Sequence, residues 1–379
     1  MQRLSRSVVI VFVLIVSSVP GIPRPAERSS PVLPPYGLDI GAPDSAQWDR
    51  AVNEASALGA RVAPLYIRWH AIEKRPRRFD FSEIEASYQY YRSKGITPVG
   101  AIYGAPRWSC ASRPLPDNLD LCFPEKRAFQ RFLRAIAQRF NRRIDHWIIL
   151  GEVNYAQSTA PGPQPEAYAE LLAASFRTLK LVNRANQVIF APVCVCSNGV
   201  DGDEVEASEE NMPGFVYTSR VLKALGGRPA FDKAWAQVYR YPVSPLLTRR
   251  VTLEDGSSET LTMKQELIRY EQLFGAAGYG SPRLELTYGW GTRDGIVEDN
   301  GQLVTPEEQA ADLEAAFSLI RDDPELSFVE TQVYFLSHDS APTDDDFWSS
   351  FGLIDRQWAE KPAADVYRRF ATMGDESLR

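Results

Sequence analysis

Glu152 is the residue of this chain whose setting best suits acid–base chemistry. It follows the short apolar run 147–150, and the aromatic residues Trp147, Tyr155 and Trp108 are expected to surround it. Aromatic surroundings remove water from a carboxyl group and raise its pKa, as a general acid requires. The pattern therefore makes Glu152 a candidate general acid.

The candidate carboxylates also have structural interpretations. Glu152 could form an ion pair with Arg107 or Arg68 at the edge of the fold. Glu285 could be a buried group held by an arginine or a hydroxyl. Because side chains alternate along a strand, Glu285 shares a face with Thr287 but starts about 6.6 Å away from it.

Eight short apolar runs predict the strands that would carry these residues. They cover residues 37–41, 62–67, 97–103, 147–150, 188–193, 234–239, 283–286 and 331–336. Amphipathic helical patterns alternate with them at residues 48–57, 81–93, 126–140, 165–182, 263–274 and 306–322. Thr305 and Glu308 form a capping-box pattern at the start of the last helix.

Eight strands that alternate with helices predict an α/β fold, the (β/α)8 TIM barrel. The rival is a doubly wound sheet, which would need a glycine-rich phosphate loop after the first strand, and segment 37–41 is not one. In a barrel, catalytic groups lie at the carboxyl ends of the strands. This restricts the search for a site to the residues that follow each predicted strand.

The amino terminus has the order of an export signal. Arg3 and Arg6 precede the apolar run 8–16, which is too short to span a bilayer, so we interpret residues 1–20 as a signal peptide. A short membrane anchor is the alternative. Residues 21–35 are predicted to be a flexible leader, 36–371 the barrel and 372–379 a tail. The expected location is secreted or periplasmic.

The composition restricts the partners. The net charge of −7 argues against nucleic acid or an anionic membrane as the partner, and three histidines make a metal site or other cofactor unexpected. Segment 201–210 holds six carboxylates, which favour a solvated acidic loop over a calcium loop. Aromatic residues make up 11% of the chain and suit the stacking of sugar rings, although most must belong to the core.

Four cysteines in an exported chain indicate disulfides. Cys110 and Cys122 flank a proline-rich loop and are predicted to pair, with Cα atoms within about 6.8 Å. Cys194 and Cys196 would lie about 6.6 Å apart in an extended strand, near the limit for a disulfide. Their pairing stays open, and two buried thiols are the simpler interpretation.

The strand ends together resemble the clan A glycoside hydrolases, in particular proteins similar to families 5 and 39. The resemblance covers nearly the whole barrel in the same order. It is carried by the segments 69–73 (WHAIE), 104–108 (GAPRW), 147–154 (WIILGEVN), 239–242 (YRYP), 286–290 (LTYGW), 306–310 (PEEQA) and 351–355 (FGLID).

The resemblance implies roles for individual residues. It makes Glu152 the acid/base and places Thr287 where the family has its nucleophilic glutamate. Gly151 replaces an asparagine that binds a sugar hydroxyl, and Tyr239 replaces a histidine. The implied substrate-binding residues are Arg68, Trp69, Trp108, Asn154, Tyr239, Tyr241, Trp290 and His338.

Two functions are compatible with this pattern. The first is a glycosidase that acts on a polysaccharide or glycoside outside the cytoplasm as a monomer, with Glu152 as acid and Glu285 or Asp339 as its partner. The second is a carbohydrate-binding protein without catalysis, because a threonine without an adjacent base is a poor nucleophile. We expect Trp108, Tyr241 and Trp290 to share a pocket with Glu152, and Glu285 to stay beyond the roughly 5–5.5 Å of a retaining pair.

Overall fold

A computed structural model describes residues 32–41, 47–111, 122–197, 201–293, 301–339 and 347–377. The predicted signal peptide therefore lies outside the described residues. Within these ranges, no helix combines the length and the apolar composition that crossing a membrane requires.

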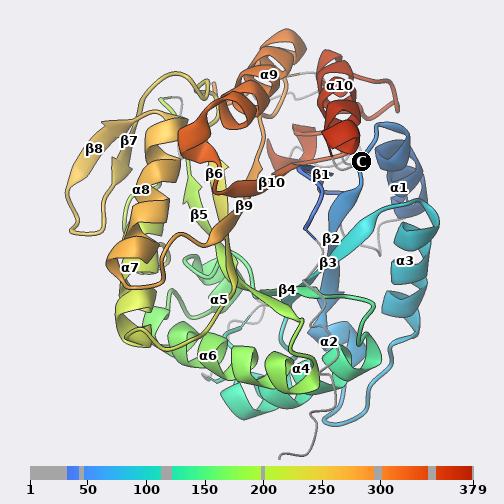
Figure 1. The fold of residues 1–379 in the computed structure, drawn as a ribbon, viewed down its shortest axis with the longest axis vertical. Helices are drawn as coiled ribbons and strands as arrows, with labels where there is room; N and C mark the ends of the chain where they lie inside the picture. Colours follow the sequence, from blue (N-terminus) through green and yellow to red (C-terminus); the bar gives the residue numbers. More distant parts are fainter. Residues whose placement is uncertain are drawn as a thin grey trace, which may run out of the picture.

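Eight parallel strands form a nearly closed barrel, as predicted (Figure 1). Their order around the barrel is β1, β10, β9, β6, β5, β4, β3 and β2. The strands are β1 (Tyr36–Leu38), β2 (Val62–Arg68), β3 (Thr97–Tyr103), β4 (His146–Ile149), β5 (Gln187–Cys196), β6 (Lys233–Tyr239), β9 (Arg283–Tyr288) and β10 (Val329–Tyr334). The chain is thus a (β/α)8 TIM barrel.

Helices surround the barrel in Figure 1. The long ones are α1 (Trp48–Ala57), α3 (Ser82–Ser93), α4 (Lys126–Arg139), α6 (Pro165–Val182), α7 (Gly214–Leu225), α8 (Met263–Ala276), α9 (Pro306–Asp322) and α10 (Pro362–Ser377). Two single-turn helices, α2 (Trp69–Ile72) and α5 (Ala156–Thr159), follow β2 and β4. The predicted capping box is confirmed, because Thr305 and Glu308 bond each other's backbone N–H groups at the start of α9.

Some elements were not predicted from the sequence. The helix α7 and the antiparallel hairpin of β7 (Arg249–Thr252) and β8 (Ser258–Leu261) lie between predicted strands. The helix α10 runs to Ser377, past the expected start of the tail at 372. Leu33, in the expected leader, is buried and packs with inward-facing residues of the barrel.

The barrel interior is filled by side chains from alternate strand positions, as the fold requires. One cluster contains Leu33, Val62, Val99, Ile148, Ile189, Trp235 and Val333. The strands β1 and β2 meet closely at Gly37, where an added Cβ would lie 2.9 Å from the carbonyl oxygen of Val62. A side chain at position 37 would therefore push the two strands apart.

Both cysteine pairs form disulfides. The predicted pairing of Cys110 with Cys122 is confirmed, with Cα atoms 5.6 Å apart. Cys194 and Cys196 are also paired, so the interpretation as two buried thiols is wrong. Their Cα atoms lie 5.1 Å apart, because the end of β5 is less extended than the ideal strand assumed from the sequence.

Candidate active site

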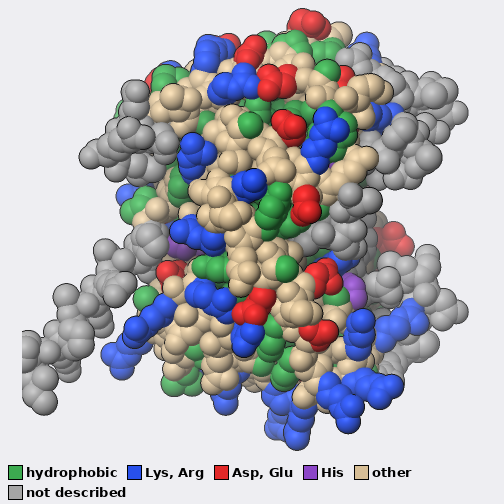
Figure 2. Space-filling model, turned by 90° about the vertical axis from the view of Figure 1, so that its right-hand side faces the viewer, with side chains coloured by type: hydrophobic (Ala, Val, Ile, Leu, Met, Phe, Trp, Pro, Cys, Tyr) green, Lys and Arg blue, Asp and Glu red, His purple; other side chains and the backbone are tan. Residues whose placement is uncertain are grey.

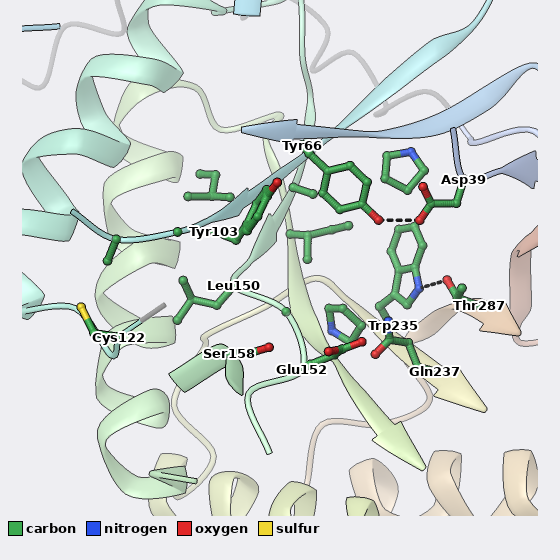
Figure 3. Close-up of a pocket in the computed structure, with 18 residues that line it drawn as sticks. Asp39, Tyr66, Tyr103, Cys122, Leu150, Glu152, Ser158, Trp235, Gln237 and Thr287 are labelled. Carbon is green, nitrogen blue, oxygen red and sulfur yellow. Dashed lines mark hydrogen bonds between the residues drawn. The ribbon is translucent and has the colours of Figure 1, made fainter. Parts of the chain in front are cut away.

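A cavity of about 260 Å³ opens at the carboxyl ends of the barrel strands. Its walls come from seven strands or from the residues that follow them. Ser158 of the short helix α5 also contributes, and the long helices do not. The polar lining consists of Asp39, Tyr66, Tyr103, Glu152, Ser158, Trp235, Gln237 and Thr287 (Figure 3). This is the face of the barrel on which catalytic groups are expected.

Glu152 projects from the loop after β4 and is half-buried in this cavity. Its backbone N–H donates to the carbonyl oxygen of Pro192 on β5, at 2.9 Å. Leu150 and Glu152 both have positive φ angles, of 64° and 46°. Non-glycine residues rarely adopt this conformation and occur often at functional sites. The loop is therefore held in a specific shape that directs the carboxyl group into the cavity.

Asn154 fixes this loop and lies outside the cavity lining. It is fully buried, and its amide nitrogen donates to the carbonyl oxygens of Cys194 and Met212 at 2.9 Å each. Its amide oxygen accepts from the N–H of Cys194 at 3.0 Å. The side chain thus ties the residues after Glu152 to the end of β5, which is a positioning role.

Thr287 lines the cavity from β9, and its hydroxyl is engaged by a neighbour. The indole N–H of Trp235 donates to its oxygen at 2.7 Å. Gln237 lies opposite Thr287 in the register of β6 and β9. The amide oxygen of Gln237 is buried and accepts no hydrogen bond from the described residues. Both side chains line the cavity.

Asp39 is a carboxyl group of the cavity that the sequence analysis missed. It follows β1, is 3% exposed, and accepts from the N–H of Gly41 at 2.9 Å. The phenol of Tyr66 donates a short hydrogen bond to its other oxygen. Burial raises the pKa of Asp39, and these two hydrogen bonds offset only part of that effect. Figure 3 shows Asp39 and Glu152 on opposite sides of Trp235.

Tyr239 interacts electrostatically with the carboxyl groups of Glu152 and Asp39, although it does not line the cavity. Burial raises the pKa of its phenol, and the charges of Glu152 and Asp39 raise it further. The charge of Glu152 also adds to the effect of burial on the pKa values of Tyr155 and Tyr241. These three phenols are therefore neutral near pH 7 and lie within electrostatic range of Glu152.

Glu285 lies below the cavity, as expected from its strand position. It is fully buried and forms an ion pair with Lys233 at 3.2 Å, and Lys233 also bonds Glu330. Burial raises the pKa of Glu285 to about 7, against the opposing charge of Lys233. Glu285 is not part of the cavity lining, so the structure does not bring it to Glu152.

Asp339 is also turned away from the cavity. Its carboxylate binds Lys361 at 2.8 Å and accepts from the N–H of Gly352 at 2.7 Å. Both contacts hold the segment after β10 against the start of α10. Asp339 is therefore a structural group and does not supply the partner of Glu152.

The structure places three expected binding residues beside the loop after β2. Trp69 is buried and donates to Glu73 at 2.6 Å. Trp108 donates to the backbone of the same residue at 3.1 Å. Arg68 lies 3.8 Å from Glu83 in a small groove on the far side of Tyr66. None of the three lines the cavity of Glu152.

The remaining expected residues also pack outside the cavity. Trp290 is 1% exposed and donates to the backbone of Val243, and Tyr241 donates to the backbone of Ser197. His338 stacks on Trp358 with ring centroids 4.8 Å apart, and burial lowers its pKa to about 4. The expectation that Trp108, Tyr241 and Trp290 share the pocket is thus not met, because each side chain is held by packing and a backbone hydrogen bond.

The strand period contains a signal for the residues that were missed. Trp235 and Gln237 have the same parity as Tyr239, so alternation alone places all three on the inner face. Asp39 lies inside the first predicted strand, 37–41, but follows the observed strand β1, at the same barrel end as Glu152.

In the described ranges, no group of three His, Cys, Asp or Glu side chains is arranged to hold a metal ion.

The acidic segment 201–210 is only partly solvated. Glu204 is buried there and accepts from the N–H groups of Gly214 and Thr252, and burial raises its pKa to about 7. Asp203 binds Arg250 on β7 at 2.9 Å. These carboxylates attach the segment to the β7–β8 hairpin.

No protein-family model matches the sequence, and no curated protein matches it. Solved structures do match. A family 39 glycoside hydrolase from Bacteroides cellulosilyticus superposes with a TM-score of 0.68 at 16% identity, over 90% of this chain and 64% of that one. The chain has a glycoside hydrolase-like fold.

Two further structures agree. A glucosidase from Croceicoccus marinus has a TM-score of 0.62 at 13% identity, over 90% of this chain and 67% of that one. A family 5 glycoside hydrolase from Streptomyces cattleya, in complex with Manβ1-4GlcNAc, has a TM-score of 0.61 at 13% identity, over 90% and 80%. At these identities the similarity establishes the fold alone.

Proposed function

We propose that the cavity binds one sugar residue of a glycoside and that Glu152 is its acid/base group. The observation that carries this proposal is the position of Glu152 after β4, in the same cavity as Thr287 on β9, within a glycoside hydrolase-like barrel. In clan A enzymes, which the sequence resembles, these two positions hold the catalytic pair. A glycoside bound in the cavity would therefore have its glycosidic bond next to Glu152.

The lining suits a polyhydroxylated ligand. Gln237 lines the cavity with a side-chain amide, a group that can both donate to and accept from sugar hydroxyls. Asp39 and Ser158 add oxygen atoms, while Tyr66, Tyr103 and Trp235 supply apolar ring surface. Together these groups can orient a sugar ring by its hydroxyls and cover its carbon skeleton.

Retaining glycosidases use a carboxylate as the nucleophile, and this chain has no carboxylate at the corresponding position on β9. Thr287 stands there, and its hydroxyl accepts from Trp235 rather than facing a base. The second carboxyl group of the cavity is Asp39. We therefore assign to Asp39 the partner role that the sequence analysis gave to Glu285 or Asp339. With a glycoside and a water molecule bound in the cavity, Glu152 would protonate the leaving oxygen while Asp39 takes a proton from the attacking water, as in inverting glycosidases.

The second candidate is a carbohydrate-binding protein without turnover. The Trp235–Thr287 hydrogen bond favours it, because a neutral pair has replaced a charged nucleophile at the centre of the cavity. Loss of turnover would leave the cavity and its hydrogen-bonding groups intact. The two candidates therefore share a binding site and differ in hydrolysis.

The proposed setting is outside the cytoplasm, as a monomer. The signal-like amino terminus and the two disulfides support it, because disulfides persist in oxidising compartments. Edman sequencing of the exported chain would locate the cleavage site, and sedimentation would give the mass in solution. An uncleaved, membrane-bound chain would instead support the alternative of an amino-terminal anchor.

A hydrolysis screen separates the two candidates. The purified chain is incubated with neutral polysaccharides and 4-nitrophenyl glycosides, with Glu152→Gln as the matched inactive variant. A glycosidase releases sugar or nitrophenol, and Glu152→Gln loses release while it retains binding. Binding without release by the wild type identifies the carbohydrate-binding protein. The proposed function would be refuted if the wild type showed no binding and no release.

A further inference from the structure

Charge is distributed very unevenly along this chain. Residues 68–143 hold sixteen Lys and Arg against seven Asp and Glu, a net charge of +9. The whole chain carries −7, so the rest of the molecule carries −16. A concentration of positive charge on an acidic protein creates a local field that attracts anions. The overall charge conceals this field.

Six of the exposed, unpaired arginines in the described part of this region lie on one loop and one helix. They are Arg75, Arg77, Arg78, Arg127, Arg131 and Arg134, and we call them the arginine strip. Their guanidinium groups form no hydrogen bond or ion pair with any other residue that the structure describes. By contrast, Arg139 and Arg143, at the end of α4, both bind Glu85.

The strip is built from one loop and one helix face. Arg127, Arg131 and Arg134 have the i, i+4, i+7 spacing that aligns side chains on α4, opposite its buried face. Phe79, which follows the loop 74–78, has its ring 6.5 Å from that of Phe132 on the buried side of α4, so the loop borders this helix. Figure 2 shows Lys and Arg gathered along the lower edge of the molecule, the end at which Figure 1 places α2 and α4.

The loop of the strip adjoins the wall of the sugar cavity. Tyr66 lines the cavity on one side and, on the other, a groove that contains Arg68 and Lys74 together with Asp80 and Glu83. The backbone of His70 donates to Gly104, another cavity residue, at 2.8 Å. An extended chain that leaves the cavity over Tyr66 would therefore reach loop 74–78 and then α4.

We propose that the arginine strip binds the negative groups of an acidic polysaccharide whose neighbouring sugar residue occupies the cavity. The inference rests on the proposed function and gives its ligand a chemical class. Arginine presents a planar fork of donors that matches carboxylate and sulfate oxygens. The cavity itself contains the carboxyl groups of Asp39 and Glu152, so its occupant would be uncharged and the anionic groups would lie along the strip.

Other anionic partners fit the surface less well. A membrane-binding face combines basic residues with apolar side chains that enter the lipid. The exposed large hydrophobic side chains of the described ranges are Val32, Leu181, Leu246, Leu247, Trp348 and Met373, and all lie outside 68–143. Single-stranded nucleic acid would require exposed aromatic rings for stacking. The one such ring in that set belongs to Trp348, away from the strip.

The test compares two triple variants with a matched control. The first replaces Arg75, Arg77 and Arg78 by Gln, and the second replaces Arg127, Arg131 and Arg134. The control replaces Arg177, Arg184 and Arg220, which are exposed on or near α6, and so removes the same charge elsewhere. Binding is measured to immobilised hyaluronan, in which a uronate alternates with an uncharged sugar, and to immobilised κ-carrageenan, in which a sulfated sugar alternates with an uncharged one. The pair separates carboxylate from sulfate recognition. Neutral mannan, duplex DNA and phosphatidylglycerol vesicles are the comparison ligands.

We expect the wild type to bind hyaluronan or κ-carrageenan, and either strip variant to weaken that binding at least about tenfold while the control does not. Wild-type binding should also weaken between about 0.05 and 0.5 M NaCl. Retained binding in both strip variants would overturn the proposal, as would tighter binding to DNA or vesicles. Binding of neutral mannan alone would overturn it and leave the proposed function standing. Binding of no saccharide would refute both.

Discussion

The indole N–H of Trp235 donates a 2.7 Å hydrogen bond to the hydroxyl oxygen of Thr287. The two residues come from adjacent parallel strands, in which Trp235 pairs with Glu285 and Gln237 pairs with Thr287. The indole thus reaches one layer up the barrel to the position that the family pattern gives to a nucleophile. A neutral pair fills that position.

Restoring the carboxylate at this position should create a retaining site. In Thr287→Glu the new carboxylate can accept from Trp235 and enter the cavity that Thr287 already lines. We expect mass spectrometry to detect a covalent adduct of this variant with a 2-fluoroglycoside inactivator, and none with the wild type. Thr287→Val, which keeps the size of threonine, is the matched control and should form none.

Adding Gly151→Asn to Thr287→Glu should increase the amount of covalent adduct. An added Cβ at Gly151 has its nearest contact at 3.7 Å, with Cγ of Pro192, so the site has room for a side chain. The asparagine would restore a donor for a sugar hydroxyl next to Glu152. An adduct in the wild type would show that Thr287 does not stand in the nucleophile's place. Its absence in the double variant would indicate a cavity adapted to binding alone.

Asp39→Asn tests the second carboxyl group. If the chain hydrolyses a glycoside, this change should reduce kcat by about 100-fold or more, because a general base contributes about 10²–10⁴-fold, while KM changes little. Asp322→Asn, at an exposed carboxylate paired with Arg321, is the control. Tyr66→Phe removes a hydrogen bond that lowers the pKa of Asp39, so the acidic limb of the pH–rate profile should move to higher pH. An unchanged kcat in Asp39→Asn would exclude the assignment.

Asn154→Ala should loosen the loop that carries Glu152. The change leaves the N–H and carbonyl of Cys194 and the carbonyl of Met212 without their partner, which costs about 2–4 kcal/mol of unfolding free energy. Saccharide binding should weaken as well. Asn186→Ala, which removes another buried amide far from the loop, should destabilise the protein in urea titrations without weakening binding. Equal binding in both variants would contradict the positioning role.

The sequence predicted the frame of the site better than its lining. Apolar runs and helical periods placed β3, α1, α6 and α9 at their observed bounds, because burial of strands and helix faces dictates these patterns. It also placed Glu152 at the mouth and Glu285 one layer below Thr287. The first follows from its place after a predicted strand, and the second from the alternation of side chains along a strand.

The contacts of individual side chains could not be predicted in the same way. Trp290 and Tyr241 follow strands, as binding residues would, but long loops fold over them and Tyr241 packs against Phe347 and Phe351. Asn154 fits a binding motif, yet its partners lie on β5 and before α7, and α7 was not predicted. Such roles depend on contacts between distant segments, which local patterns do not encode.

Glu285 should make the protein less stable as pH rises. Its folded pKa of about 7 exceeds the ordinary value of 4.5, so its contribution is complete below about pH 4.5 and is lost as pH rises through about 7. The loss amounts to at most about 3 kcal/mol. Relative to the wild type, Glu285→Gln should therefore gain unfolding free energy between about pH 5 and pH 8. Lys233 keeps Glu330 as a partner in this variant.

The control for this titration is Glu314→Gln. Glu314 lies on the outside of α9, where it pairs with Arg369, and its replacement should shift stability equally at both pH values. Urea unfolding at each pH gives the comparison. A constant difference between wild type and Glu285→Gln would show that the buried carboxyl group does not titrate in this range.

Saturation-transfer NMR on neutral oligosaccharides tests whether the cavity beside Glu152 is a sugar site. Ala101 lines this cavity, and Ala101→Phe would fill it, while Ala311→Phe on the exposed face of α9 serves as a size-matched control. We expect transfer from the wild type and the control to at least one saccharide, and its loss in a folded Ala101→Phe variant. No transfer from the wild type to any saccharide, or equal transfer from Ala101→Phe, would contradict this expectation.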